Sequence, residues 1–288
     1  MRPMPEVPEV AALAGRLSEL MSAQVVAAAR LRSVGALKTY DPPLAALAGT
    51  TVHGWTRHGK FLDMASGDLH LVVYLARGGW IRWRDRLAEA RPSLRGPLAL
   101  QLALAGGAGI EVTEQGTEKR LALYVVRDPR EVPGIARLGI DVLDPALDAA
   151  RLGTLLAGTR GQLKSVLADQ TVVAGVGNAY SDEILHAARL SPFRRAASLD
   201  PGEVGVLAAA LRSVMSAAVD RAAATDMTAL KPDKKEHLRV HGRTGQPCPV
   251  CGDVIREVSL ASRSFQYCAT CQTGGRVLAD RRLSRLLR

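Results

Sequence analysis

The stretch CPVCGDVIREVSLASRSFQYCATC, residues 248–271, holds every cysteine of the 288-residue chain. The four residues Cys248, Cys251, Cys268 and Cys271 form the pattern C-x2-C-x16-C-x2-C. Tetrahedral zinc takes four such ligands, and a two-residue gap lets one tight turn supply two of them. Disulfides are the alternative, but a cytosolic chain disfavours them. Four cysteines leave no coordination position open, so the pattern predicts one structural Zn2+ held by a hairpin.

The region around the cysteines is basic. A zinc module of this size buries little apolar surface, so the metal would hold it folded and its role would be to present side chains such as Arg263. The net charge is +10, and residues 231–288 carry +7 of it, with twelve Lys and Arg against five Asp and Glu. A localised basic region favours a polyanionic partner such as nucleic acid, although a face that only aids solubility gives the same charge.

Composition and hydropathy exclude several classes of protein. Hydrophobic residues make up 47% of the chain, which is enough for packed cores. No apolar run reaches the roughly 18 residues of a membrane span; the best candidate, LALQLALAGGAGI, is interrupted by Gln101 and rich in glycine. The start, MRPMPEVPEV, lacks the basic and apolar regions of a signal peptide. We therefore expect a soluble, cytoplasmic monomer without a membrane partner.

Upstream of the cysteines the periodicity changes, which predicts an α+β protein of three domains. Residues 1–138 alternate in short apolar and polar runs after one helical segment and predict a β-rich domain. Residues 139–235 have helical spacing, and residues 236–288 hold the zinc module and a basic tail. We interpret LKPDKKEH (230–237) as a charged connector and GGRVLADRRLSRLLR (274–288) as a short basic helix.

The helical region contains a glycine-punctuated turn within LKSVLADQTVVAGVGNAYSDEILHAARLSP, residues 163–192. Gly175 and Gly177 permit a tight turn, and Asn178 is placed to cap the helix that follows. Backbone N–H groups at such a helix start bind phosphate readily. Taken alone, however, this segment is explained better by an ordinary helical corner.

The motifs taken in order resemble the formamidopyrimidine-DNA glycosylase / endonuclease VIII family. That family carries an N-terminal PELPEVE, an element of the form D-Q-x-x-V-A-G-x-G-N-x-Y-x-D-E, and a terminal zinc finger with arginine before its third cysteine; this chain has PEVPEV, DQTVVAGVGNAYSDE and the module above. The resemblance covers nearly the whole chain. It implies a catalytic β-sandwich with one long helix, a helix–two-turn–helix DNA-binding domain and a zinc finger, acting on damaged DNA in base-excision repair as a glycosylase with AP lyase activity.

The resemblance also implies roles for single residues. Pro5 matches the family's N-terminal proline nucleophile, and Glu6 its general acid. Lys60, in RHGKFL, matches a lysine that contacts DNA and assists β-elimination; Arg263 matches an arginine that assists δ-elimination. The residues expected to bind DNA are Lys60, Arg120, Arg160, Lys164, Asn178 and Arg263. Arg160 and Lys164 are one turn apart on the helix expected before the glycine turn, where both would flank a phosphate backbone.

The chemistry requires Pro5 to be the first residue. An α-amino group titrates at about pH 7.7–8.0, so a useful fraction is neutral and can attack the sugar C1′ to give an iminium. An internal proline nitrogen is an amide, whose lone pair is delocalised into the carbonyl. We therefore expect translation to start at Met4, with methionine removal exposing Pro5, and MRP to be a misassigned or removed leader.

Three segments depart from the family's pattern. Residue 77, where a wedge methionine is expected, is arginine; residues 114–121 lack the wedge-loop phenylalanine; and residues 222–236 lack a long, glycine-rich lesion-capping stretch. Lesion recognition is therefore expected to differ, and 8-oxoguanine is not assumed as substrate. One alternative is a non-catalytic or weakly catalytic protein that binds damaged DNA. A plain zinc-ribbon protein that binds DNA or RNA is ranked last, because it leaves PEVPEV and RHGK without a purpose.

Overall fold

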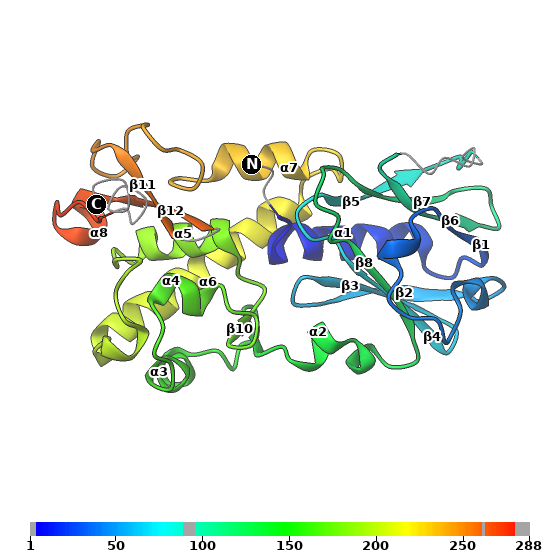
Figure 1. Ribbon diagram of the computed structural model, residues 1–288, viewed down its shortest axis with the longest axis horizontal. Coiled ribbons are helices and arrows are strands. Elements are labelled where there is room, and N and C mark those ends of the chain that lie inside the picture. Colours follow the sequence, from blue (N-terminus) through cyan, green and yellow to red (C-terminus); the bar gives the residue numbers. More distant parts are fainter. Residues whose placement is uncertain (1–3, 89–95, 261–262, 280–288) are drawn as a thin grey trace, which may run out of the picture. The chain divides into compact units, whose positions relative to one another are not determined.

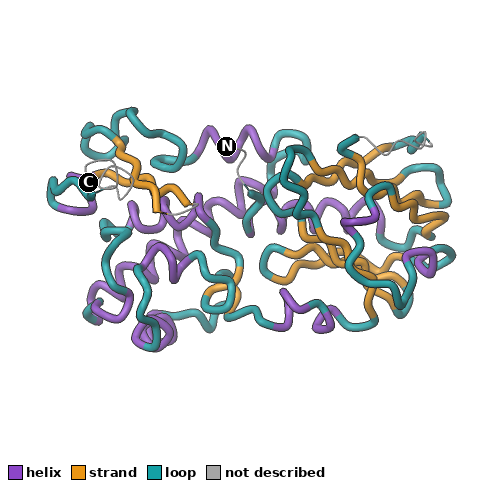
Figure 2. Tube along the Cα trace, in the orientation of Figure 1, coloured by secondary structure: helices purple, strands orange, loops and turns teal. Residues whose placement is uncertain are grey.

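The computed structural model of the protein describes residues 4–88, 96–260 and 263–279, with the side chains of Leu260 and Arg263 outside the description (Figure 1). The chain divides into two compact units. The first comprises Met1–Arg137 and Ala222–Leu230, and the second Leu138–Arg221 and Lys231–Arg288. Strands predominate in the first unit and helices in the second (Figure 2). The α+β fold class is confirmed, whereas the three domain boundaries stay a prediction.

The first unit is a β-sandwich of two four-stranded antiparallel sheets, ordered β1-β6-β7-β5 and β2-β3-β4-β8. The strands are β1 (Val26–Leu31), β2 (Val52–His58), β3 (Phe61–Ser66), β4 (Leu69–Tyr74), β5 (Gly79–Arg84), β6 (Leu98–Leu104), β7 (Gly109–Glu114) and β8 (Ala122–Val126). Short helical segments at Val34–Ala36, Leu44–Leu47, Pro129–Glu131 and Pro133–Ala136 (α2) connect or follow them. Each sheet turns one apolar face to a shared core.

Helix α1 (Val7–Met21) completes that core. Its residues Val10, Leu13, Leu17 and Met21 recur at helical spacing and are all fully buried. The helix packs against β2 and β3 of one sheet. Burying each such side chain contributes about 1.5–3 kcal/mol, so the helix that begins at PEVPEV is held firmly in the first unit.

The segment Ala222–Leu230 packs into the same core instead of forming a loop over a ligand. Ala222, Met227 and Leu230 are buried there among the residues of the sandwich. Between them, the Asp226 carboxylate accepts hydrogen bonds from the backbone and the hydroxyl of Thr228. Residues 222–230, the first part of the stretch 222–236, therefore form a short segment packed in the core of the first unit.

The second unit is mainly helical. Its helices are α3 (Ala149–Ala157), α4 (Leu163–Leu167), α5 (Asn178–Ala187), α6 (Pro201–Ala223), α7 (Leu230–His237) and α8 (Ala269–Thr273), with a short 3-10 turn at Ala196–Ser198. Strands β9 (Ile140–Asp141) and β10 (Val173–Ala174) form a parallel pair, and β11 (Ile255–Leu260) and β12 (Arg263–Cys268) form the predicted antiparallel hairpin.

Helix α7 corrects the interpretation of residues 230–237 as a connector. Pro232 lies in its first turn, where the missing N–H costs no hydrogen bond. Asp233 follows in that first turn and Lys235 lies in the last turn, and both charges suit the helix dipole. The high charge of the segment hid these local signals. The basic helix expected at 274–288 lies partly outside the described residues, and the described part, up to residue 279, is not helical beyond Thr273.

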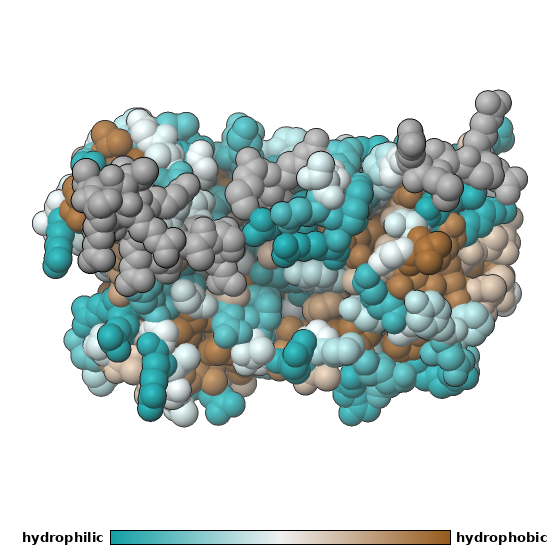
Figure 3. Space-filling view, in the orientation of Figure 1, coloured by the Kyte–Doolittle hydropathy of each residue, from teal (hydrophilic) through white to brown (hydrophobic). Residues whose placement is uncertain are grey.

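By length and composition alone, α6 is apolar enough to cross a membrane: its most apolar 18-residue stretch has a mean hydropathy of 1.4. Of that stretch, 33% is buried. The choice of LALQLALAGGAGI as the best candidate is therefore wrong; that stretch forms β6 and the start of β7. Leu207, Leu211 and Met215 are buried at helical spacing, as on a core helix. Val206, on another face, is 52% exposed. The face drawn in Figure 3 shows hydrophobic residues, in brown, beside hydrophilic ones, in teal.

Candidate DNA-binding and catalytic site

The motif PEVPEV forms the start of α1. Pro5 is buried, and Glu6 is the N-cap residue, 2% exposed. The Glu9 carboxylate, also 2% exposed, accepts the backbone N–H of Glu6 at 2.8 Å. A carboxylate at this position is favoured by the unpaired N–H groups and the dipole of the helix start. Glu9 therefore caps the helix, and Glu6 lies directly after Pro5.

Tyr74, at the end of β4, connects the start of the chain to the turn that carries Lys60. Its hydroxyl donates a hydrogen bond to Met4 Sδ at 3.6 Å, and Met4 directly precedes Pro5. Its ring packs against Phe61, with ring centroids 4.8 Å apart. Phe61 directly follows Lys60, which is 4% exposed between β2 and β3. Sequence reasoning missed Tyr74, because a tyrosine on an alternating strand resembles any packing residue.

Two arginines act on the same tyrosine. Burial raises the pKa of Tyr74 above its ordinary value of 10, and the charges of Arg77 and Arg120 oppose that shift. Arg77 is exposed in the turn between β4 and β5. The Arg120 side chain is 67% exposed between β7 and β8, where its ion pair with Glu118 is also exposed and therefore weak. The hydroxyl thus keeps its proton at neutral pH beside two accessible cations.

The turns that carry Arg77 and Arg120 are held against each other. Glu114 Oε1 accepts the backbone N–H groups of Arg120 and Leu121 at 2.6 and 2.7 Å. A Cβ atom at Gly78 would lie 2.1 Å from the carbonyl oxygen of Gln115, so only glycine allows this approach. The segment 114–121 is therefore a short, fixed turn.

Replacing Arg120 with alanine is expected to lower the affinity for abasic-site DNA and to reduce the slope of log K against log salt by about 1, because the predicted phosphate contact would be lost. Stability should change by less than about 0.5 kcal/mol, since the side chain is exposed. Titrations at several salt concentrations measure both quantities. The control is Arg84→Ala, which removes an arginine of β5 that is paired with Glu111 of β7. An unchanged slope for Arg120→Ala contradicts a phosphate contact.

In the second unit, Asn178 begins α5 but does not cap it. The N-cap residue is Gly177, and the Asn178 amide nitrogen instead donates to the Ser264 carbonyl of β12 at 3.2 Å. The N-cap prediction is therefore wrong. The tight turn is confirmed at Gly175, which has φ = +106°, whereas Gly177 is extended. Asn178 Oδ1 is buried without a hydrogen-bond partner among the described residues.

Lys164 does not face solvent, which speaks against the prediction that it flanks a DNA backbone. Its side chain is 1% exposed, and its Nζ lies 2.5 Å from Asp182 Oδ1 and 2.8 Å from the carbonyl oxygen of Asn178. The ammonium group also lies 5.1 Å from the ring centroid of Phe265. Arg160 is exposed in the loop before α4, not on a helix with Lys164, and its DNA contact stays a prediction.

Two carboxylates of α5, those of Asp182 and Glu183, also hold the segment that leads into the zinc module. Asp182 Oδ2 lies 2.7 Å from His241 Nδ1. The Glu183 carboxylate accepts the backbone N–H groups of Arg239, Val240 and His241 at 2.8–3.0 Å. Burial raises the pKa of Glu183, and these three hydrogen bonds oppose the shift. These carboxylates are thus structural, a role that sequence spacing did not indicate.

The four cysteines converge, with their Sγ atoms all within 4.8 Å of one another. Thiolates about 2.3 Å from a tetrahedral metal lie about 3.8 Å apart, and the Sγ pairs Cys248–Cys271 and Cys251–Cys268 are separated by 3.9 and 3.4 Å. These distances are too long for disulfides. The arrangement fits one structural Zn2+, as predicted. The Arg263 side chain lies outside the described residues, so its role stays a prediction.

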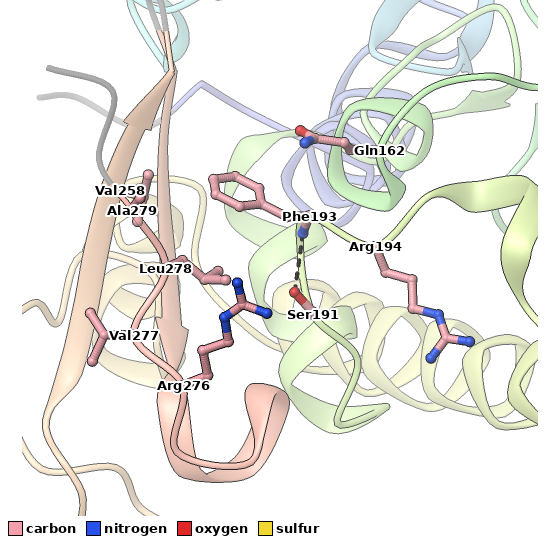
Figure 4. A pocket seen from close by; sticks show the side chains of 9 residues that line it. All are labelled: Gln162, Ser191, Phe193, Arg194, Val258, Arg276, Val277, Leu278 and Ala279. Carbon is pink, nitrogen blue, oxygen red and sulfur yellow. Dashed lines mark hydrogen bonds between the residues drawn. The ribbon is translucent and has the colours of Figure 1, made fainter. Parts of the chain in front are cut away.

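A separate hollow of about 740 Å³ lies in the second unit (Figure 4). Its lining residues are Gln162, Ser191, Phe193, Arg194, Val258, Arg276, Val277, Leu278 and Ala279. The Arg194 guanidinium is paired with Glu203, and the Phe193 ring meets Phe265 edge-on at 5.7 Å. Among the described side chains, no expected catalytic residue lines this hollow, so we give it no part in the chemistry.

Comparison with known proteins matches three family profiles along the chain. The formamidopyrimidine-DNA glycosylase N-terminal domain matches residues 4–121. The formamidopyrimidine-DNA glycosylase H2TH domain matches residues 138–229, and the zinc finger found in FPG and IleRS matches residues 245–274. Together these profiles cover most of the chain. The apolar helix α6 lies within the H2TH match.

Individual relatives agree with the profiles. The chain is 56% identical over 151 residues (52% of this chain, 94% of the relative) to an uncharacterized formamidopyrimidine-DNA glycosylase-like protein of Mycobacterium tuberculosis. It is 36% identical to the formamidopyrimidine-DNA glycosylase of Moorella thermoacetica, covering 88% of this chain and 94% of that one. The crystal structure of MutM (Fpg) from Thermus thermophilus aligns with a TM-score of 0.79 at 33% identity, covering 93% and 98% of the two chains.

A fourth comparison concerns the fold. The Lactococcus lactis formamidopyrimidine-DNA glycosylase, crystallised non-covalently bound to DNA containing an AP site, aligns with a TM-score of 0.81 at 22% identity, covering 93% of this chain and 99% of that one. At this identity the likeness shows the fold alone. The profiles, the relatives and the four-cysteine hairpin lead to one conclusion: the chain belongs to the formamidopyrimidine-DNA glycosylase (Fpg/MutM) family.

Proposed function

We propose that this protein is a base-excision-repair DNA glycosylase with AP lyase activity, which acts through Pro5 as an N-terminal amine. The observation that carries the proposal is the arrangement at the start of α1. Glu6 is buried directly after Pro5, and the Tyr74–Met4 and Tyr74–Phe61 contacts link this point to the turn of Lys60. Buried ionisable groups such as Glu6 and Lys60 are frequent at catalytic sites.

The proposed reaction uses these groups in sequence. The damaged nucleotide is flipped out of the duplex. The neutral Pro5 nitrogen attacks C1′ and displaces the base, the C1′–O4′ bond opens, and the nitrogen loses its proton, while Glu6 donates a proton to the ring oxygen or the departing base. The resulting iminium acidifies the C2′ proton, whose removal expels the 3′ phosphate in a β-elimination that Lys60 assists. A second elimination, assisted by Arg263, expels the 5′ phosphate, and water then releases the enzyme.

We propose damaged DNA as the partner and the cytoplasm as the location of a monomeric enzyme. The family's structures with abasic-site DNA support this partner. The DNA contacts we assign are Lys60, Arg120, Arg160, Asn178 and Arg263. For Lys164 we propose a supporting role, because its ammonium group binds the backbone carbonyl of Asn178.

A second candidate is a protein that binds abasic sites on the same scaffold with little or no catalysis. The supporting observation is the exposed Arg77 at the expected wedge position, because a charged, solvated side chain fills an apolar void in the duplex poorly.

Borohydride trapping on duplex DNA with one abasic site distinguishes the two candidates. The sample must first be verified by mass spectrometry to begin at Pro5. A covalent adduct and strand cleavage are expected. Tight binding without adduct or cleavage would exclude the lyase and leave the binding protein.

A further inference from the structure

His186 makes a contact with the zinc site that the four-cysteine motif does not include. It lies on α5 and is 4% exposed, and its Nε2 atom is 3.3 Å from Cys248 Sγ. Cys248 is itself buried, at 3% exposure. Helix α5 lies beside strand β12 of the zinc hairpin (Figure 1). The contact therefore joins the helical region to a metal-binding sulfur across 62 residues of sequence.

The chemistry of the sulfur fixes the direction of this hydrogen bond. A cysteine that binds zinc is a thiolate and has no proton to donate. The hydrogen must therefore reside on His186 Nε2, which gives an N–H···S bond. Such a bond orients the thiolate and withdraws electron density from it, as outer partners of metal ligands do.

His186 is not needed as a zinc ligand. The four Sγ atoms already supply the complete tetrahedral set within 4.8 Å of one another. A histidine ligand would place its nitrogen about 2.0–2.1 Å from the metal, in competition with a cysteine. Here the nitrogen approaches the sulfur instead.

We propose that His186 is a positioning residue of the zinc site, which fixes Cys248 through an N–H···S hydrogen bond and thereby seats the zinc module on α5. Two other contacts from the same helix support this role. Asn178 donates to the backbone of β12, and Glu183 binds the backbone that leads into the module. Of these three contacts, the one from His186 is made to a cysteine of the zinc site.

Two substitutions separate the N–H donor from the bulk of the ring. His186→Phe keeps a ring of similar size but removes the donor, whereas His186→Gln places an amide N–H near the position of Nε2. His237→Phe, which changes an exposed histidine on α7, is the control. Zinc release from the full-length protein to an excess of chelator is measured for each, together with the absorption spectrum of the Co2+-substituted form.

The Phe variant is expected to release zinc about tenfold faster or more, within the range for outer partners of metal ligands. Its sulfur-to-cobalt charge-transfer band should move to longer wavelength, while the four-thiolate band pattern is retained. The Gln and His237 variants should resemble the wild type in both measurements.

Three results would overturn the proposal. Equal zinc release from wild type and His186→Phe would mean that the contact does not hold the site. Equal acceleration in the Phe and Gln variants would show that ring packing, not the N–H group, matters. A wild-type cobalt spectrum with one nitrogen and three sulfur ligands, lost in His186→Phe, would make His186 a ligand.

Discussion

A chain that begins at Pro5 is expected to form a borohydride-stable adduct with abasic-site DNA, and the same chain with one glycine before Pro5 is expected to form none. The added residue converts the secondary amine of Pro5 into an amide, whose lone pair is delocalised into the carbonyl. Attack on C1′ is then lost completely, which is the largest effect expected from any single change in this protein.

The structure makes this pair of chains a fair comparison. Met4 is accommodated before Pro5, with its sulfur accepting a hydrogen bond from Tyr74, so an extra residue does not need to disturb α1. Both chains should therefore bind abasic-site DNA with similar affinity. Adducts are counted on denaturing gels after verification of each N-terminus by mass spectrometry.

The possible outcomes assign the nucleophile. Trapping of both chains would show that another amine, with Lys60 the first to test, is the nucleophile. Trapping of neither, with binding retained, would favour the binding protein. If the Pro5 chain alone is trapped, Glu6→Gln then tests proton donation: base removal should fall, whereas trapping on a preformed abasic site should persist because no base has to leave.

The sequence predicts features whose causes are local. The zinc hairpin follows from two C-x2-C turns, and the turn at Gly175 follows from a glycine that adopts a positive φ. Helix α7 also has local causes: its high charge favours a connector, but Pro232 and Asp233 suit a helix start. Here the residues at the helix start, not the overall charge, indicate the structure.

Other features depend on partners that are distant in the sequence. Asn178 suits an N-cap, but a carbonyl 86 residues later takes its amide. His186 suits the last turn of α5, and only the fold brings Cys248 to it. Tyr74 was missed because its partners come from the chain start and a neighbouring strand. A single sequence reveals which side chains are suited to chemistry, but not which of them already have a partner elsewhere in the fold.

Lys164 is the clearest such case, and its replacement by methionine is expected to destabilise the second unit by about 3–5 kcal/mol. The substitution leaves the Asp182 carboxylate, whose side chain is 0% exposed, without its cation. His241 remains beside Asp182 but is only partly buried. Lys235→Met, which removes an exposed lysine of α7, should leave the free energy of unfolding nearly unchanged.

The chain allows each unit to be followed separately. All three tryptophans, Trp55, Trp80 and Trp83, belong to the first unit, so tryptophan emission in a urea titration reports that unit. The Lys164→Met variant should keep this transition. Amide hydrogen exchange in α5 should become faster, by the factor that corresponds to the expected loss of stability. Equal loss of stability in both units would mean that the ion pair supports the whole chain, against our expectation.

A double variant and a salt titration separate structure from DNA binding. Lys164→Met combined with Asp182→Asn should recover part of the lost stability, because the uncompensated charge is the main cost. At a temperature where Lys164→Met stays folded, the slope of log K against log salt should match that of the wild type, since the Lys164 ammonium group is already paired with Asp182. A slope reduced by about 1 would instead show a direct phosphate contact, and would support the prediction that Lys164 binds DNA.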